Sequence, residues 1–413
     1  MNAMDTILPF LRRHPGKSLA LAIFAVFSIA YLAAAGNGFG YYRHLAAAIL
    51  TGRLDVDGSF IDPLHLRDFS YFNERYFYPM GILPALVLVP AVAIFGMEFP
   101  QAALVLVLAA AISWLVYRMA RQLQFSERDA LWVVFSVLAG SPLAYLVLRG
   151  TVFDAYLAHL LSFACLLAAL VECLGKRRWF VMGILVGLSA MARPLTIFTA
   201  IFFFITAWTD RGETTSRWKK IYLFFLPLAM SATVIAAYNY LRFGNLFEVG
   251  YTFQLIAPEV VAARNVGLFS LRHFPGNFYR AFLALPMPIL ALNSQESIIF
   301  PYLTFDGKGI SLLVTFPFLF LLARIRKFSR EVALGVLTAV VIALSNLGSF
   351  ASGEHQFGYR YGFDFLPFLL IALLAGLPTP RLGRLGKILI LAGALVNAWL
   401  TLPVLLGLQN LGS

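Results

Sequence analysis

The sequence is poor in charged residues and in cysteine. Of its 413 residues, only 13% are charged while 60% are hydrophobic, and the mean hydropathy is +0.80. A soluble domain of this length could not bury so much apolar surface, so these values exclude a water-soluble enzyme and indicate that the bilayer is the solvent. The two cysteines, Cys165 and Cys173, lie in one apolar run. A disulfide between helical positions eight residues apart has poor geometry, so we expect both to be unpaired.

Motifs of several soluble enzyme classes are also absent. The sequence contains no Walker loop, no dinucleotide-binding glycine motif after a strand and no His-Glu-x-x-His. Its six histidines and two cysteines show no zinc-ligand spacing. These absences argue against nucleotide chemistry, so an activated donor is expected to arrive through the membrane. The acidic loops described below would permit a divalent metal, but nothing in the sequence demands one.

The net charge of +12 is unevenly distributed along the chain. Most of the Lys and Arg residues lie in short clusters between apolar runs, whereas the other loops are close to neutral. The positive-inside rule places the basic loops in the cytoplasm and the other loops on the outer side. The clusters are Arg12, Arg13 and Lys17; Arg118, Arg121 and Arg128; Lys176, Arg177 and Arg178; Arg211, Arg217, Lys219 and Lys220; Arg324, Arg326, Lys327 and Arg330; and Arg381, Arg384 and Lys387.

The charge pattern also limits which apolar runs cross the membrane. If the N-terminus and Arg118 are both cytoplasmic, an even number of crossings separates them, yet three apolar runs are available, at 18–36, 79–96 and 99–118. The middle run contains three prolines, which interrupt backbone hydrogen bonding and are tolerated at membrane depth only where protein or water covers the backbone. We therefore interpret 79–96 as a re-entrant or interfacial segment on the outer side. An ordinary crossing helix is the alternative.

The remaining runs predict an all-α polytopic membrane protein with about eleven transmembrane helices in a single domain, residues 1–413. The outer side then holds the first outer loop, 37–98, and a long segment, 242–309. Because basic clusters flank the run 179–209, we expect a tight hairpin with Arg193 at its outer tip. A single long tilted helix is the alternative, and it would invert the topology downstream. The run 18–36 is too long for a cleavable signal peptide, so we expect it to stay as a helix. The expected crossings are 18–36, 99–118, 130–148, 155–174, 179–193, 194–209, 221–241, 310–323, 331–349, 361–377 and 388–406.

Carboxylates near the outer membrane surface are the candidate catalytic residues. A partly desolvated carboxyl group has a raised pKa and can act as a general base toward a hydroxyl or amine. Asp55, Asp57 and Asp68 of the first outer loop qualify by type, although such a loop also needs Asp for turns and solvation. Asp154 stands alone beside an apolar run, and His159 follows five residues later. On position we rank Asp68 and Asp57 ahead of Asp55.

Arginines at helix junctions are the candidate phosphate ligands. Arg149, Arg193 and Arg360 lie between apolar runs, where a persistent charge usually pairs with another group or meets a polar ligand. The planar guanidinium suits forked hydrogen bonding of phosphate. The alternative for each is a local ion pair, for example Arg360 with Asp364 one turn along a helix. We expect at least one of these arginines to bind a lipid phosphate.

Five stretches of the chain carry a resemblance: Tyr41 to Asp55, Asp68 to Leu86, Ala192 to Pro194, Tyr238 to Tyr251, and Phe357 to Pro367. In order and spacing they resemble the multi-pass GT-C glycosyltransferases. These are the polyprenyl-phosphate-sugar-dependent enzymes related to protein mannosyltransferases and aminoarabinose transferases. Each motif is loose, and the order of the motifs over most of the chain carries the resemblance. One departure is that 36–42 has no carboxylate, whereas many relatives carry an acidic pair after the first helix.

The resemblance implies a GT-C-like fold with a non-crossing segment in the first outer loop, and an inverting sugar transfer on the periplasmic face of a bacterial inner membrane. A polyprenyl-phosphate sugar would bind from the bilayer with its phosphate on outer-side arginines. An outer-loop Asp would position or deprotonate the acceptor, which is a lipid, a glycan or a protein. Asp154 matches the family's second carboxylate. The implied substrate-binding residues are Arg193, Arg360, Arg149, Tyr78, His159 and Tyr251.

Two further functions remain open from the sequence. A flippase or transporter for lipid-linked sugars would favour charged or broken-helix sites near the midplane and two repeated halves. This chain places its charges near one face and shows no repeat. A non-catalytic membrane subunit is the third possibility, because the expected acidic pair is missing. Nothing in the sequence identifies the sugar or the acceptor, and no feature indicates a nucleic-acid partner.

Overall fold

The computed structural model describes residues 40–61, 67–149, 155–210, 215–290, 298–351, 353–354 and 356–405. This part of the chain is mostly helical, with two small antiparallel sheets of two strands each. The first expected crossing, 18–36, lies outside the described residues.

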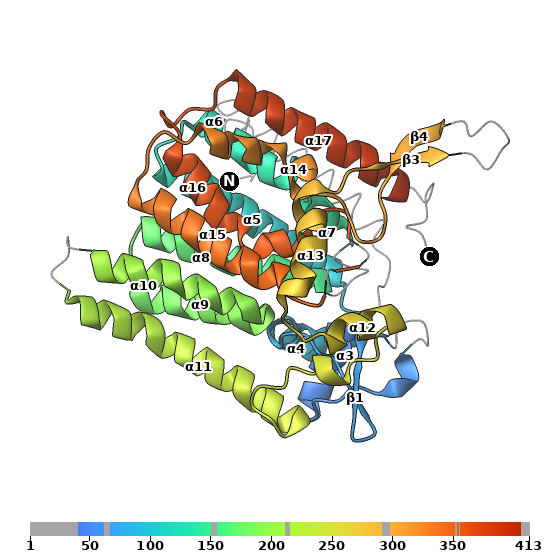
Figure 1. Ribbon diagram of the computed structural model, residues 1–413. Coiled ribbons are helices and arrows are strands. Elements are labelled where there is room, and N and C mark those ends of the chain that lie inside the picture. The colour runs from blue at the N-terminus through green and yellow to red at the C-terminus, as the bar shows by residue number, and fades with distance from the viewer. Residues whose placement is uncertain are drawn as a thin grey trace, which may run out of the picture.

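Long helices lie side by side in layers and form a bundle (Figure 1). Their bounds are α5 (Gln101–Gln122), α6 (Glu127–Leu138), α7 (Leu143–Arg149), α8 (Ala155–Leu174), α9 (Trp179–Ala192), α10 (Ala200–Thr209), α11 (Arg217–Phe243), α15 (Arg330–Leu347), α16 (Leu366–Gly376) and α17 (Arg384–Leu405). Within the described residues, α5, α8, α11, α15 and α17 are each long and apolar enough to cross a membrane, and the bent pair α6 and α7 makes a sixth span if counted as one. This supports a helical membrane protein. The total of about eleven crossings stays a prediction.

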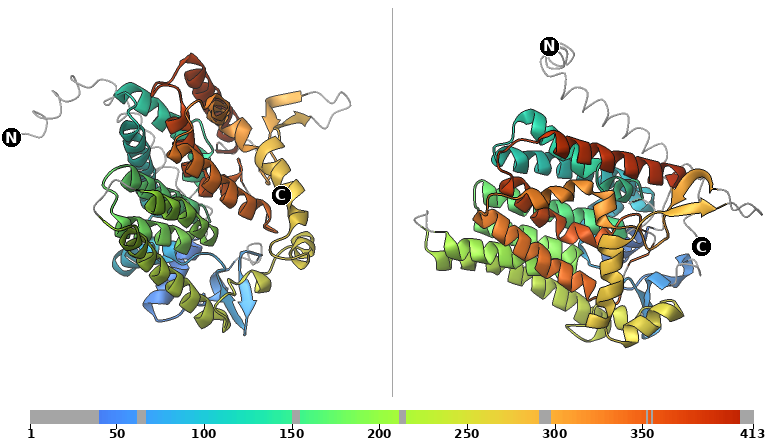
Figure 2. Two further views of the ribbon diagram at one scale, coloured as in Figure 1. Left: turned by 60° about the vertical axis from the view of Figure 1, so that its left-hand side comes forward. Right: turned by 45° about the horizontal axis from the view of Figure 1, so that its top comes forward.

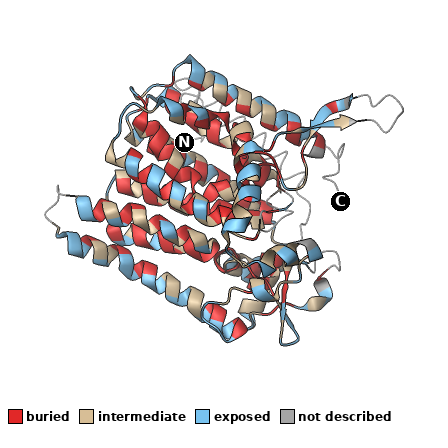
Figure 3. Ribbon diagram, in the orientation of Figure 1, coloured by how far each residue is buried: buried red, intermediate tan, exposed pale blue. Residues whose placement is uncertain are grey.

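The core of the bundle runs along α8, which is largely buried between α5 and α9. By contrast α11 and α17, at the edges of the bundle, expose much of their surface (Figure 3). Their exposed side chains include Leu241 and Leu395, as expected of helices that face lipid. Gly183 and Gly187 of α9 let α11 approach closely, which is a common packing device in membranes.

The run 179–209 is folded as a hairpin. The Ser189 hydroxyl lies 2.8 Å from Oγ1 of Thr196, whereas residues seven apart on one continuous helix are separated by about 10 Å. At the other end, Arg177 before α9 lies 3.3 Å from Asp210 after α10. The chain therefore turns back at Arg193, as expected from the charge pattern, and a single long tilted helix is excluded.

Four expected helices, 130–148, 194–209, 310–323 and 361–377, are interrupted near a proline or glycine. The run 130–148 is two helices, α6 and α7, that meet at 56° around Gly140 and Pro142. The run 310–323 has no long helix, because Pro317 lacks the N–H that would continue it. The sequence prediction of continuous helices was wrong here because it counted apolar length alone. The pieces are α14 (Leu312–Thr315) and the 3-10 helix η8 (Pro317–Arg324), η4 (Pro194–Thr199) before α10, and η9 (Arg360–Asp364) before α16.

The elements outside the bundle gather at one end of it, which we call the loop end (Figures 1 and 2). The opposite end, the basic end, carries the described basic clusters, and ion pairs such as Lys387 with Asp129 at 3.4 Å join its helices. The separation of charge along the bundle therefore follows the prediction. The loop-end elements are α3 (Tyr41–Leu50), α4 (Leu83–Phe95), α12 (Pro258–Asn265), α13 (Phe274–Phe278), the hairpin of β1 (Ser70–Phe72) and β2 (Arg75–Phe77), and the hairpin of β3 (Met287–Leu290) and β4 (Ile298–Thr304).

The segment around α4 starts and finishes at the loop end. Gly81, before α4, packs against the backbone carbonyls of Met191 and Ala192 at the turn of the 179–209 hairpin. After α4, the Met97 carbonyl accepts a 2.8 Å hydrogen bond from Nη1 of Arg43 in α3. Such a path agrees with a segment that does not cross the bundle. Its re-entrant or interfacial position in a bilayer stays a prediction.

Candidate functional site

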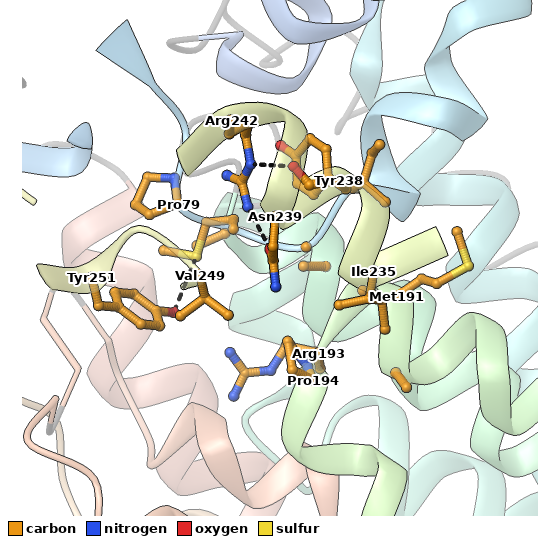
Figure 4. Close-up of a pocket in the computed structure, with 17 residues that line it drawn as sticks. Pro79, Met191, Arg193, Pro194, Ile235, Tyr238, Asn239, Arg242, Val249 and Tyr251 are labelled. Carbon is orange, nitrogen blue, oxygen red and sulfur yellow. Dashed lines mark hydrogen bonds between the residues drawn. The ribbon is translucent and has the colours of Figure 1, made fainter. Parts of the chain in front are cut away.

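Two adjoining cavities lie at the loop end of the bundle. The smaller has a volume of about 40 Å³ and the larger about 250 Å³. Both are lined by Arg193, Pro194, Val249 and Tyr251, so they share a wall. Figure 4 shows Arg193, from the turn of the hairpin, and Tyr251, from the segment after α11, reaching the same space from separate elements.

Arg193 is held by a buried carboxylate. Its Nε and Nη2 lie 3.2 and 2.8 Å from the two oxygens of Asp364, whose side chain is only 1% exposed. Asn346 donates a further hydrogen bond of 3.3 Å to the same carboxylate, and the Tyr361 ring lies 4.9 Å from the guanidinium carbon. This bidentate pair fixes the guanidinium plane while Arg193 still lines both cavities. The alternative of a local pair between Arg360 and Asp364 is wrong, because Asp364 pairs with Arg193.

The other two candidate arginines lie close to this pair. Arg360 stacks at 5.5 Å over Tyr361, whose other neighbour is Arg193, and at 5.6 Å over Tyr156. Arg149 interacts electrostatically with the same Tyr156. Three arginines that are far apart in the sequence therefore converge around two tyrosine rings. Arg360 and Arg149 themselves line neither cavity, so their positive charge lies behind the wall to which Arg193 and Tyr361 contribute.

His159 and Tyr251 reach the surroundings of Arg193 from separate elements. His159 of α8 is buried, with Nδ1 3.8 Å from Oδ1 of Asp364, so it faces the carboxylate. Tyr251 lines both cavities, and its hydroxyl lies 3.9 Å from the Met80 sulfur. Burial raises the pKa of the Tyr251 hydroxyl above its ordinary value, so it stays protonated at neutral pH and can donate a hydrogen bond.

Tyr78 has a supporting position in this structure. Its ring is buried against the rings of Tyr41 and Tyr42, and it lines neither cavity. Its carbonyl accepts a 3.0 Å hydrogen bond from Nη1 of Arg242 near the end of α11. Arg242 also donates to Oδ1 of Asn239 at 2.9 Å, and both residues line the smaller cavity. Neither was a sequence candidate, although two polar residues one turn apart at the end of an apolar helix are a detectable signal.

Asp55 and Asp57 of the first outer loop are engaged in local contacts. Arg53 lies 2.5 Å from Asp55, and this hydrogen-bonded pair holds the pKa of the carboxyl below its usual range. Asp57 accepts a 2.9 Å hydrogen bond from the Ser59 backbone, which caps the short helix Gly58–Phe60 and lowers the Asp57 pKa. Neither residue lines the two cavities. A lowered pKa makes a carboxylate a weaker base at neutral pH.

Asp68 is half-buried in a turn that packs against the segment bearing Tyr251. The Phe69 carbonyl accepts a 2.9 Å hydrogen bond from Leu255, and the Ser70 hydroxyl donates one of 2.6 Å to the Gly250 carbonyl. Asp154 lies outside the described residues. The residue that follows it, Ala155, lines the smaller cavity.

The described residues include no group of three or more His, Cys, Asp or Glu side chains that could hold a metal ion. Cys165 and Cys173 are both free thiols, as expected. The convergent groups at the cavities are therefore arginines and tyrosines rather than metal ligands.

No protein-family model matches the chain, and no curated protein matches it. Two solved structures are similar to it, both crystal structures of the Archaeoglobus fulgidus oligosaccharyltransferase. One is tethered through a disulfide to an acceptor peptide containing the NVT sequon. This match has a TM-score of 0.44 and 12% identity, and it covers 94% of this chain and 56% of the oligosaccharyltransferase chain. The other, in the apo form, has a TM-score of 0.41 and 13% identity and covers 92% and 55%. The chain thus spans about half the length of these structures.

Proposed function

We propose that the protein is a GT-C type membrane glycosyltransferase that moves a sugar from a polyprenyl-phosphate donor to a lipid, glycan or protein acceptor. The observation that carries the proposal is Arg193, which is fixed by buried Asp364 and lines two cavities at the loop end. A cation held in this way is preorganised for an anionic group. The motif order along the sequence supports the same class.

The donor phosphate would bind at Arg193, with Arg360 and Arg149 adding positive charge nearby. Negative charge develops on the departing phosphate as the bond to the sugar breaks, and fixed cations stabilise that charge without reorganising. The larger cavity is mostly apolar and includes Leu195, Leu268 and Phe350. Such a lining suits the first prenyl units of a lipid carrier.

The acceptor would meet an outer-loop carboxylate. This group positions or deprotonates the attacking hydroxyl or amine, the sugar carbon is attacked in line, and polyprenyl phosphate leaves with inversion. Of the four candidates, Asp154 and Asp68 are favoured, because Ala155 lines the smaller cavity and Asp68 lies beside the segment of Tyr251. Asp55 and Asp57 are disfavoured by their local contacts.

The setting proposed is a bacterial inner membrane, with the loop end in the periplasm and the N-terminus in the cytoplasm. The described basic clusters at the opposite end support this orientation. A divalent metal is not part of the proposal.

A non-catalytic membrane subunit is the second candidate function. The observation that favours it is that, among the described residues, no carboxylate lines either cavity. Such a subunit would still bind a lipid phosphate at Arg193 but would transfer no sugar.

Mass spectrometry of cell-envelope glycans, with and without the gene, tests the proposal. We expect one sugar-bearing species to vanish in its absence and to return with the wild-type chain. At least one of Asp154→Asn, Asp68→Asn and Asp57→Asn should reduce that species about 100-fold or more, because a general base typically contributes 10²- to 10⁴-fold. The matched control is Glu98→Gln, an exposed carboxylate of the same end, which should restore the wild-type level.

Two outcomes would contradict parts of this scheme. If all three Asp variants restore the species fully, the assigned base is wrong. If the glycans are identical with and without the protein while it binds polyprenyl phosphate, the non-catalytic subunit is the better function.

A further inference from the structure

A third, open cavity at the loop end is lined by cationic side chains. Its volume is about 280 Å³, and it lies between the region of α13 and the loop that follows β4. Phe350 lines both this cavity and the larger cavity of Arg193, so the two are neighbours. The polar lining includes Arg272, His273, Arg280 and Lys308.

The positive charge of this cavity is only partly compensated. Arg280 lies 2.6 Å from Oδ2 of Asp306, and the other oxygen of Asp306 accepts a 3.0 Å hydrogen bond from the Lys308 backbone. Arg272 and Lys308 are exposed, and neither makes an ion pair with a described carboxylate. Three cationic side chains therefore line the cavity, and Asp306, which pairs with one of them, is already engaged.

The position of this charge distinguishes it from the basic clusters. Loops assigned to the outer side are close to neutral overall, so the positive-inside rule does not explain cations gathered here. Like charges in one concave site repel each other and focus a field that attracts an anion. An anionic ligand would remove that repulsion.

The wall that carries Arg272 is anchored to the end of α15. The Asn277 side chain donates hydrogen bonds of 2.9 and 2.7 Å to the carbonyls of Leu347 and Ser349. The Ser270 backbone donates one of 2.8 Å to the Gly348 carbonyl. These bonds fix the backbone of this wall in place without a ligand.

Exposed apolar side chains flank the same wall. Leu271 is 87% exposed, and Phe278 and Leu283 are also exposed on the segment that follows. An anion with apolar chains attached would cover these residues, whereas free phosphate would leave them in water. We propose that this cavity binds the headgroup phosphate of an anionic lipid, as a site separate from Arg193 and independent of the proposed sugar transfer.

Binding to the purified full-length chain in a neutral detergent tests the proposal. The probes are dihexanoyl phosphatidic acid, dihexanoyl phosphatidylcholine and inorganic phosphate, measured by titration calorimetry. We expect saturable binding of phosphatidic acid that weakens at least about 10-fold in Arg272→Gln/Lys308→Gln, since the phosphate loses two charged hydrogen-bond donors. Phosphatidylcholine and inorganic phosphate should bind much more weakly.

A steric variant separates this site from diffuse attraction. Gly276 lines the cavity, and a Cβ added there meets no atom within 4 Å. Gly276→Phe should therefore fold normally, keep every charge and block phosphatidic acid as strongly as the double variant. The matched control is Arg67→Gln, which removes an exposed charge at the same end but outside the cavity, and it should bind like the wild type.

The results that overturn the proposal are specific. If Gly276→Phe binds normally, or Arg67→Gln weakens binding as much as the double variant, the attraction is diffuse and there is no site. If inorganic phosphate binds as tightly as phosphatidic acid, the lipid part is wrong. Sugar transfer is not measured, so failure of the proposed transferase would not affect these readings.

Discussion

At the scale of single residues, the pair of Arg193 and Asp364 dominates the candidate site. Both groups are largely withdrawn from water, and the 2.8 Å contact between them offsets the cost of that desolvation. Asn346 and His159 face the same carboxylate. The pair therefore has two roles, since it stabilises the turn of the hairpin and orients a cation toward the cavities.

These two roles separate in a mutant cycle. Arg193→Met should lower the free energy of unfolding by about 3–5 kcal/mol, because it leaves Asp364 buried without its cation. The double variant Arg193→Met/Asp364→Asn should regain most of the lost stability, but it should still fail to bind polyprenyl phosphate. Thermal unfolding in detergent and a lipid-binding assay measure the two effects.

The control for this cycle is an exposed pair at the same end. Arg53→Met breaks the pair with Asp55, in which Arg53 is 55% exposed, and should change stability by less than about 1 kcal/mol. If Arg193→Met and Arg193→Met/Asp364→Asn are equally destabilised, an unpaired charge on Asp364 is not the cause of the lost stability.

At the scale of elements, the close approach of α9 to α11 sets the position of Arg193. A Cβ at Gly183 would overlap the Phe224 carbonyl oxygen and lie 2.6 Å from Cγ of Pro227. Only a residue without a side chain fits, because both neighbouring atoms belong to the rigid part of α11. The turn of the 179–209 hairpin at Arg193 is therefore positioned by helix packing at Gly183, farther along α9.

Gly183→Ala should push α9 away from α11. We expect a loss of about 1–3 kcal/mol in stability, as is typical of overpacking, together with weaker binding of polyprenyl phosphate at Arg193. Gly383→Ala is the matched control, since a Cβ there meets no atom within 4 Å, and it should leave both quantities unchanged. Equal melting temperatures for the two variants would show that α9 and α11 can separate at little cost.

At the scale of the whole molecule, charge is divided between two ends of one bundle. The described basic clusters lie at one end. The small sheets and all three cavities, including the third cavity lined by Arg272 and Lys308, lie at the other. If the positive-inside rule holds for this chain, the loop end faces away from the cytoplasm.

Cysteine labelling tests this orientation. In a background with Cys165→Ala and Cys173→Ala, Arg75→Cys on the β1–β2 hairpin should react with an impermeant maleimide added to intact cells. Lys176→Cys, exposed at the basic end, should react only after the cells are broken. The reverse pattern would invert the topology and move the cavities to the cytoplasmic side.

The sequence by itself determined the membrane class and the concentration of basic residues at one end of the bundle, and it favoured a turn at Arg193 over a single long helix. These features depend on apolar content and charge counted over short windows, and such local quantities can be read without knowing how helices pack. The same reasoning failed at 310–323, because apolar length was counted without the effect of Pro317.

Only the tertiary structure decided which groups meet. Arg193 and Asp364 are 171 positions apart, and Arg242 reaches Tyr78 across 164 positions. The local pairing of Arg360 with Asp364 satisfied every spacing rule and was still wrong, since helix packing brought Arg193 closer. Residue type and spacing specify what a side chain can bind, whereas the packing of distant helices decides which partner it has.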